Sequence, residues 1–418
     1  MADETEHSNH HPLFHRTYVF EKQGASAAQD STTSISIKPV TTFSMFKTFY
    51  RVPFLVYRDD PYWVAPFWRE VNDFFRTENP FWSHADCVLY IAVKNDEFVG
   101  RIAAIIDHSF CEATKTQTGY FGFFECIEDL EVASALWRAA ESWLRLNGMT
   151  SMRGPIDGRV DIGCGFLATG FQHRPCLLSS YSPPYYVSFA ERYGMIKVRD
   201  FFDYYVDLTR SIPDQLKQRA DDCAASGVKI RRFRRLRTGT ELRWWVPLFL
   251  ETFSDHWGFV PVSPEEVTTR FGVKQLRWTV DPRLFLIAEV EGEPVAYLWA
   301  TPDYNQLFQS MDGRLGPVQY LQVLIGMRRI TTGKLHFIGI KNACRHRHVA
   351  SYLNYAALME MQRRGYQGAE VGMIDEMNPH AHQTIAITGA TRYKTHRVFE
   401  KSLQPSEAST SSETVRRP

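Results

Sequence analysis

The sequence predicts an α/β protein in which two similar units follow one another along the chain. Residues 88–106 and 283–302 each have the pattern of two strands joined by a tight turn, at Asn95-Asp96 and at Glu291-Gly292. In both halves a strand, a helix and another strand then follow in the same order. With 418 residues and 44% apolar content, the chain is large enough for two cores. We therefore expect each unit to contain a mixed, mostly antiparallel sheet flanked by helices.

In the first unit, the strand after the hairpin is expected at 119–127, the helix at 128–149 and the next strand at 150–156. Gly148 lies near the end of this helix, and a Gly-Pro pair ends the strand. Polar composition predicts flexible ends for the chain. The expected division is a lead-in at 1–33, a first unit at 34–208, a boundary segment at 209–227, a second unit at 228–403 and a tail at 404–418.

The second unit contains the most informative segment of the chain, from Leu335 to Lys401. After a helical insertion near 314–330, its elements are expected in a fixed order. They are a short apolar strand at 336–341, a basic turn at 344–351, a helix at 349–366, a buried strand at 368–374, an Asn-containing turn and a closing hairpin that includes Tyr393.

The basic turn has the properties of an anion-binding site. A helix that begins near Val349 presents unpaired backbone amides and a partial positive charge at its N-terminus, which suits a diphosphate. Arg345 and Arg347 precede this terminus and add two cationic side chains that hydrogen-bond well to phosphate.

Taken in order, these elements resemble the GNAT acyltransferase superfamily. Its pyrophosphate turn is usually Arg/Gln-x-x-Gly-x-Gly/Ala, and residues Arg345 to Ala350 keep the outer positions of that motif. His348 stands where the family usually has glycine. The resemblance implies two tandem GNAT-like domains, an acyl-CoA co-substrate and no metal. The residues that it implies for the acyl-CoA site are Ile338, Gly339, Ile340, Arg345, Arg347, His348, Val349, Ala350, Ser351 and Asn378. Asn378 also fits a helix N-cap before Pro379.

Acyl transfer from a thioester to an amine needs a group that accepts the amine's proton and one that protonates the thiolate. Asp375 and Glu376 follow the buried strand directly and are candidates for the first role, with Glu376 favoured; the alternative is a solvated helix start. His380 and His382 are further candidates, since histidine is the side chain that most often shuttles protons; the alternative is an ordinary surface histidine. Tyr393 is the candidate that protonates the thiolate, or else a packed hairpin residue.

The amine acceptor is expected to lie among bulky apolar residues. The helix predicted within 243–261 and the insertion at 313–330 are both rich in them, so together they predict a wide apolar groove, with an ordinary core as the alternative. The stretch at 229–237 alternates basic and apolar residues as a strand does, and is either a solvated edge or a patch that faces a membrane.

The composition excludes several classes of function. A formal net charge of +1 provides no field for nucleic acid. The chain has seven cysteines without a CxxC pair, which fits reduced thiols in the cytoplasm. No secretory signal and no apolar run of about 18 residues is present. We expect a cytoplasmic protein, with peripheral contact at the inner membrane as a further possibility and an oligomeric state that the sequence leaves open.

The two units differ where a phosphate turn is needed. The first has ECIEDLEVAS at 125–134, and its carboxylates would repel a diphosphate, so we expect acyl-CoA only in the second unit. Stretches such as 58–67, 119–144 and 182–186 resemble a bacterial group of tandem GNAT-like proteins related to the bacterial ceramide synthases. This resemblance implies an acyl-CoA-dependent N-acyltransferase that uses a long acyl chain and a sphingoid-type amine. The alternatives are an acetyltransferase of a small amine and a non-catalytic sensor of acyl-CoA or lipid.

Overall fold

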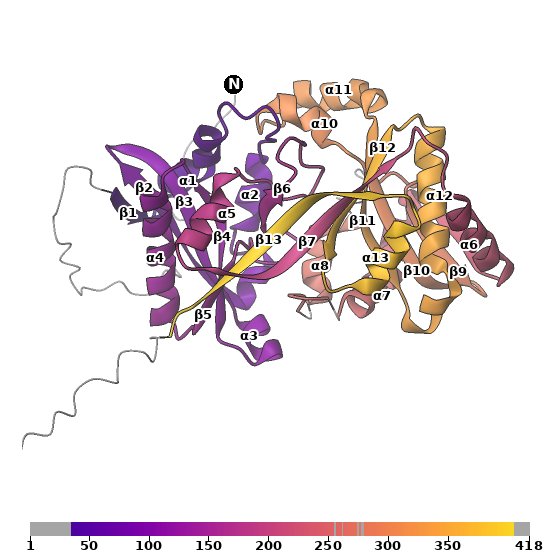
Figure 1. Cartoon of the computed structure of the whole chain (residues 1–418), viewed down its shortest axis with the longest axis horizontal. Helices are drawn as coiled ribbons and strands as arrows, with labels where there is room; N and C mark the ends of the chain where they lie inside the picture. The colour runs from indigo at the N-terminus through magenta and orange to yellow at the C-terminus, as the bar shows by residue number, and fades with distance from the viewer. Residues whose placement is uncertain (1–34, 255, 261, 274–275, 277–279, 405–418) are drawn as a thin grey trace, which may run out of the picture.

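The computed structural model describes residues 35–254, 256–260, 262–273, 276 and 280–404 (Figure 1). The expected lead-in at 1–33 and, apart from Gln404, the expected tail lie outside the described residues. The two halves of the chain share a single mixed sheet that is covered by helices on both faces. The α/β fold class is therefore confirmed.

Seven strands come from the N-terminal half, residues 35–207. They are β1 (Ile35–Pro39), β2 (Ala85–Lys94), β3 (Glu97–Asp107), β4 (Thr118–Cys126), β5 (Ser151–Gly154), β6 (Phe166–Thr169) and β7 (Ile196–Asp207). The C-terminal half, residues 214–402, contributes β8 (Lys229–Arg232), β9 (Phe285–Val290), β10 (Glu293–Pro302), β11 (Thr332–Ile340), β12 (Gly368–Asp375) and β13 (Thr391–Ser402).

Helices pack on this sheet in both halves. Those of the N-terminal half are α1 (Phe43–Val56), α2 (Trp68–Phe74), α3 (His108–Thr114), α4 (Leu130–Leu146) and α5 (Tyr185–Arg192). Those of the C-terminal half are α6 (Asp214–Ala225), α7 (Thr238–Phe253), α8 (Pro264–Arg270), α10 (Asn305–Phe308), α11 (Pro317–Gly326), α12 (Val349–Arg363) and α13 (Pro379–Ala386).

The predicted hairpins are the β2–β3 and β9–β10 pairs. Asn95 and Asp96 both have positive φ, as do Glu291 and Gly292, so each turn has the twist that suits two right-twisted strands. The boundary segment at 209–227 forms α6, which packs on α12. The closing hairpin is a wrong prediction, because residues 391–402 form the single strand β13.

The last strand of each half lies against the other half. The strand order in the centre of the sheet is β5-β13-β7-β12, so β13 lies between two strands of the N-terminal half. Phe399 pairs with Gly154 of β5, and β7 pairs with β12, for example Tyr205 with Glu370. Figure 1 shows β13 and β7 side by side, crossing between the halves. This exchange makes the two halves structurally dependent on each other.

A buried cluster of charges lies where the exchanged strands meet. Glu370 of β12 is fully buried and pairs with Lys334 of β11 at 2.7 Å and with Lys394 of β13 at 2.9 Å. Tyr393 donates a further hydrogen bond to the same carboxylate, and Ser179 Oγ donates another at 2.9 Å. Burial opposes ionisation of Glu370, but the two lysines outweigh it and hold its pKa well below the usual value.

Replacing Glu370 by alanine is expected to leave two buried lysines without their counter-charge and to lower the free energy of unfolding by about 3–5 kcal/mol. Urea denaturation followed by circular dichroism measures this. The matched control is Lys217→Ala, which breaks an ion pair with Asp221 whose side chains are both 58% exposed and should change the free energy of unfolding far less than Glu370→Ala does. Equal effects of the two variants would contradict a structural role for the cluster.

Candidate functional site

The sheet opens between β11 and β12. These parallel strands pair only from Thr332 to Leu335, and beyond Leu335 they separate. At the same point β11 contains a bulge, because Leu335 pairs with Ala300 and Phe337 pairs with Trp299. His336 is the extra residue, so its side chain is placed at the start of the opening.

A cavity of about 120 Å³ lies at this opening. Both halves build it: α7 and the residues after it form one wall, and the segment at 160–164 of the N-terminal half forms another. Its lining is largely apolar and includes the aromatic residues Phe201, Phe249, Phe253, Trp257, Phe259 and Phe337. The predicted contribution of residues 243–261 to an apolar site is therefore seen. The insertion at 313–330, contrary to expectation, does not line this cavity.

Three polar side chains that line the cavity come from the separated strands. His336 lies 2.8 Å from Thr301 through Nε2; burial, assisted by the charge of Lys334, lowers its pKa to about 3. The imidazole is therefore neutral at neutral pH and has a nitrogen that accepts a hydrogen bond. Asp375 Oδ1 accepts hydrogen bonds from the amide of Met377 at 2.9 Å and from Arg199 at 3.3 Å. Lys334 is held by the Glu370 cluster.

The basic turn has the predicted position before α12. Residues Asn342–Arg347 form a short 3₁₀ helix, and His348 follows it with a φ of 58°. This left-handed conformation is the one that glycine adopts without strain, which explains why the related motif has glycine there. Arg345 and Arg347 are exposed beside the N-terminus of α12. Val349 and Ser351 are buried, and Ala350 is half-buried.

The other residues predicted for acyl-CoA lie nearby or have structural roles. Ile338, Gly339 and Ile340 pair with β10 along one edge of β11, while the opposite edge has no pairing partner beyond Leu335 among the described strands. Gly339 packs against Thr252 and Tyr297, where a Cβ would collide. Asn378 caps α13 by accepting the Ala381 amide at 3.0 Å.

The predicted catalytic residues are not all brought together. Asp375 lines the cavity, whereas the Glu376 carboxylate binds Lys197 at 2.7 Å and the Asp200 amide at 3.0 Å. His380 is exposed on α13. Tyr393 is directed to Glu370, and burial together with that carboxylate raises its pKa far above the usual value, so the phenol keeps its proton. The sequence did not predict a role for His336, because no local pattern in the strand indicates the bulge.

The corresponding opening of the N-terminal half is filled by its own residues. β4 and β5 pair only from Thr118 to Tyr120, and the amide of Phe123 beyond that point donates to the Asp157 carboxylate at 2.6 Å. The Cys126 amide donates to the Tyr186 hydroxyl at 2.8 Å. A Cβ on Gly122 would collide with the Ile156 carbonyl, so the chain itself lies against the strand. Space that is open between β11 and β12 is thus occupied between β4 and β5.

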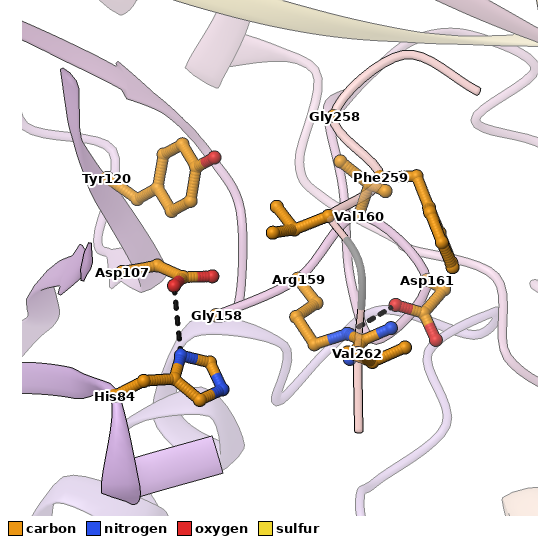
Figure 2. A pocket seen from close by; sticks show the side chains of 11 residues that line it. His84, Asp107, Tyr120, Gly158, Arg159, Val160, Asp161, Gly258, Phe259 and Val262 are labelled. Atoms are coloured by element: carbon orange, nitrogen blue, oxygen red, sulfur yellow. Dashed lines mark hydrogen bonds and ion pairs between the residues drawn. The ribbon is translucent and has the colours of Figure 1, made fainter. Parts of the chain in front are cut away.

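An ionic network connects the halves beside the cavity (Figure 2). His84 and Asp107 line a small pocket of about 10 Å³ together with Val160, Asp161 and Phe259, which also line the larger cavity. Figure 2 shows these side chains around the pocket. His84 binds Asp107 at 3.0 Å and Glu266 at 3.3 Å. These hydrogen bonds, that to Asp107 first, raise the pKa of His84 to about 9.

The same network holds the wall segment in place. Arg159 binds Glu266 of α8 at 3.2 Å and Asp161 at 3.0 Å, and Arg270 of α8 also binds Asp161. Because α8 belongs to the C-terminal half, these contacts fix residues 159–161 of the N-terminal half against the cavity.

Comparison with known proteins shows the fold and the family of this chain. No family model matches the sequence. A tandem GNAT protein from the clavulanic acid biosynthesis pathway superposes with a TM-score of 0.54 at 12% identity, covering 90% of this chain and all of that one. The bacterial ceramide synthase of Caulobacter vibrioides (strain NA1000 / CB15N) is 30% identical over 383 residues, which cover 90% of this chain and 99% of that protein. The chain belongs to the bacterial ceramide synthase family of GNAT acyltransferases.

Two further matches cover most of this chain. Protein YghO of Escherichia coli (strain K12) is 27% identical over 363 residues, 85% of this chain and 93% of that protein. A GCN5-related glucosamine N-acetyltransferase region of a fungal β-N-acetylglucosaminidase superposes with a TM-score of 0.52 at 13% identity, covering 90% of this chain and 39% of that one. This member of the family is thus an N-acyltransferase with the GNAT fold.

Two kinds of feature are absent from the described residues. None of the helices there combines the length and the apolar character that crossing a bilayer requires. Within the same ranges, no three His, Cys, Asp or Glu side chains gather as a metal ion would need.

The His84 network predicts a pH dependence of stability. Because folding raises the pKa of His84 from about 6.5 to about 9, its contribution is complete below pH 6.5 and is lost as the pH rises through 9. We expect a decrease of roughly 1–3 kcal/mol in unfolding free energy over this interval, measured by urea denaturation. His84→Gln should abolish the His84 part of this slope. A variant with the same slope as the wild type would refute the assignment.

Proposed function

We propose that this acyltransferase uses acyl-CoA and transfers a long acyl chain to the primary amine of a sphingoid-type lipid. The main support for the proposal is the opening between β11 and β12. It leads from the end of β11, which the basic turn follows, to an aromatic cavity. The 30% identity with a protein described as a bacterial ceramide synthase supports the same chemistry.

The acyl-CoA diphosphate would be held at the N-terminus of α12, where Arg345 and Arg347 supply charge and the first amides of the helix supply donors. From there the pantetheine arm would run along the open edge of β11 beside residues 338–340. This path ends at the bulge, so the thioester carbonyl would reach His336 and the cavity. The amides of the open edge are donors of the kind that stabilise an oxyanion.

The acceptor amine would attack the thioester carbon from the cavity. As the new C–N bond forms, the amine loses a proton and the C–S bond breaks to release the thiolate. When Nε2 of His336 carries its proton and donates to Thr301, Nδ1 would accept a hydrogen bond from the amine and orient it. The Asp375 carboxylate in the cavity would accept the amine's proton, directly or through water. The proton then leaves with the CoA thiol.

The aromatic lining supports apolar chains next to the reacting groups. Phe249, Phe253 and Phe337 contact one another at centroid distances of 5.7 Å or less and form a continuous apolar wall. The cavity, at about 120 Å³, is smaller than the roughly 300–1,000 Å³ of pockets that enclose a whole drug-sized ligand. It would therefore hold the reacting ends, while the hydrocarbon chains extend beyond it.

A thiol-release assay tests the proposed function. With palmitoyl-CoA and sphinganine, we expect a kcat/KM about 100-fold or more above that with acetyl-CoA, because each apolar methylene that the wall buries contributes about 0.8 kcal/mol. Mass spectrometry should detect the ceramide product. Preference for acetyl-CoA with a small amine would indicate the acetyltransferase alternative. Tight acyl-CoA binding by calorimetry without release of thiol from any amine would reject catalysis.

Variants of the cavity carboxylate and imidazole test the proposed roles. Asp375→Asn should lower kcat by about 100-fold or more, because its carboxylate accepts the proton, whereas His336→Gln should lower kcat less, because the imidazole only orients the amine; the KM for acyl-CoA should stay nearly unchanged in both. Glu376→Gln is the matched comparison, since its carboxylate is bound by Lys197 outside the cavity lining. A large loss of kcat in Glu376→Gln alone would reassign the proton acceptor to Glu376. Thermal denaturation of each variant controls for folding.

A further inference from the structure

The insertion between β10 and β11 exposes an apolar face. Val318, Leu321, Leu324 and Ile325 of α11 are between 57% and 70% exposed, and Tyr320 is 54% exposed. Their spacing of three and four residues places them on one continuous side of the helix. Large apolar side chains that gather in this way on a surface mark a binding surface rather than ordinary scatter.

The base of the insertion is firmly held, while α11 itself projects. The ring of Phe308 at the end of α10 packs on Phe67 at 4.9 Å, and Gln309 Nε2 donates to the Pro61 carbonyl at 2.5 Å. Gly326 at the end of α11 contacts Leu307. Figure 1 shows α10 and α11 together at the outer edge of the molecule, near the place where the two halves meet. The exposed face is therefore presented by a fixed element.

The basic residues beside α11 indicate an anionic partner for this face. Residues 313–330 contain three basic side chains and no acidic one; Arg314, Arg328 and Arg329 are all exposed. Basic residues that border an apolar helix fit the anionic head groups of lipids, each contributing about 1 kcal/mol. A second copy of the chain would bring like charges together across the same face, which disfavours self-association.

We propose that α11 is an interfacial helix that docks the protein on the surface of an anionic lipid bilayer. Its 10 residues extend about 15 Å, too short for the roughly 30 Å of a hydrocarbon core, so the helix lies in the plane of the surface with its apolar face inserted. The other basic stretch, at 229–237, is less suited, because Arg231 is engaged by Glu241 at 2.9 Å and by Glu289 at 2.5 Å.

The connection from β10 to α11 also contacts a segment next to the cavity wall. Asn305 donates to the Pro175 carbonyl at 2.9 Å, Gln309 accepts from Arg174 at 2.9 Å, and the Leu177 amide donates to Asp303 at 3.1 Å. Leu178 and Ser180, which follow this segment, line the cavity. Docking through α11 would thus place the cavity wall near the bilayer, from which a lipid amine would come. This last step rests on the proposed function, whereas the docking itself does not.

Flotation of the full chain with vesicles tests the docking. We expect the wild type to float with vesicles of phosphatidylcholine that contain phosphatidylglycerol, and more weakly with phosphatidylcholine alone. The double variant Leu321→Glu/Ile325→Glu should lower the partition coefficient by about tenfold or more. Arg328→Gln/Arg329→Gln should lower it by about tenfold, for the anionic vesicles only. Leu146→Glu is the control and should float as the wild type does, since Leu146 is 74% exposed on α4.

Thiol release with a substrate dispersed in detergent separates this proposal from the proposed function. The α11 variants should keep wild-type turnover there, because no residue of α11 lines the cavity. Three results would overturn the docking. The first is equal flotation of the wild type and the α11 variants. The second is loss of flotation in Leu236→Glu, within the stretch at 229–237, together with unchanged flotation of the α11 variants. The third is a wild-type dimer that does not bind vesicles and that becomes monomeric in the α11 double variant.

Discussion

The ion cluster at Glu370 is the constraint on which the rest of the structure depends. One fully buried carboxylate joins β11, β12 and β13 and also binds Ser179 of the N-terminal half. A buried charge is tolerated only when its partners are in place, so the cluster has a single favourable arrangement. That arrangement requires β13 to have crossed to the N-terminal half. The cavity begins immediately beyond Lys334, and its geometry therefore depends on the completed exchange of strands.

The two halves show how one architecture gives one open site and one closed site. In each half two parallel strands separate after a short pairing: β4 and β5 separate beyond Tyr120, and β11 and β12 separate beyond Leu335. In the N-terminal half, Asp157 and Tyr186 satisfy the freed amides, and burial raises the pKa of the nearby Glu125 to about 7. A diphosphate at the start of α4 would meet Asp129, which already caps that helix, at the place where α12 has arginines. The N-terminal half serves the open site as a wall, through residues 159–164.

Elements whose signal is local were predictable from the sequence. The turns at Asn95-Asp96 and Glu291-Gly292 have residues that tolerate positive φ, and the α12 helix has both apolar periodicity and a basic N-terminal approach. The capping role of Asn378 before Pro379 was equally local. Elements whose place depends on distant partners were not predictable. Residues 391–402 have the composition of a strand, but its neighbours are more than 150 residues away in the chain.

The site divides in the same way. The sequence by itself determined that a basic turn precedes a helix at Val349, and that Asp375 follows a buried strand, because charge and periodicity are properties of neighbouring residues. Only the tertiary structure decided that His336 bulges into a cavity, that Glu376 is bound by Lys197, and that the apolar residues of 317–326 face outward. Each of these depends on strand register or on packing between segments far apart, and such contacts follow from the balance of the whole fold rather than from any local pattern.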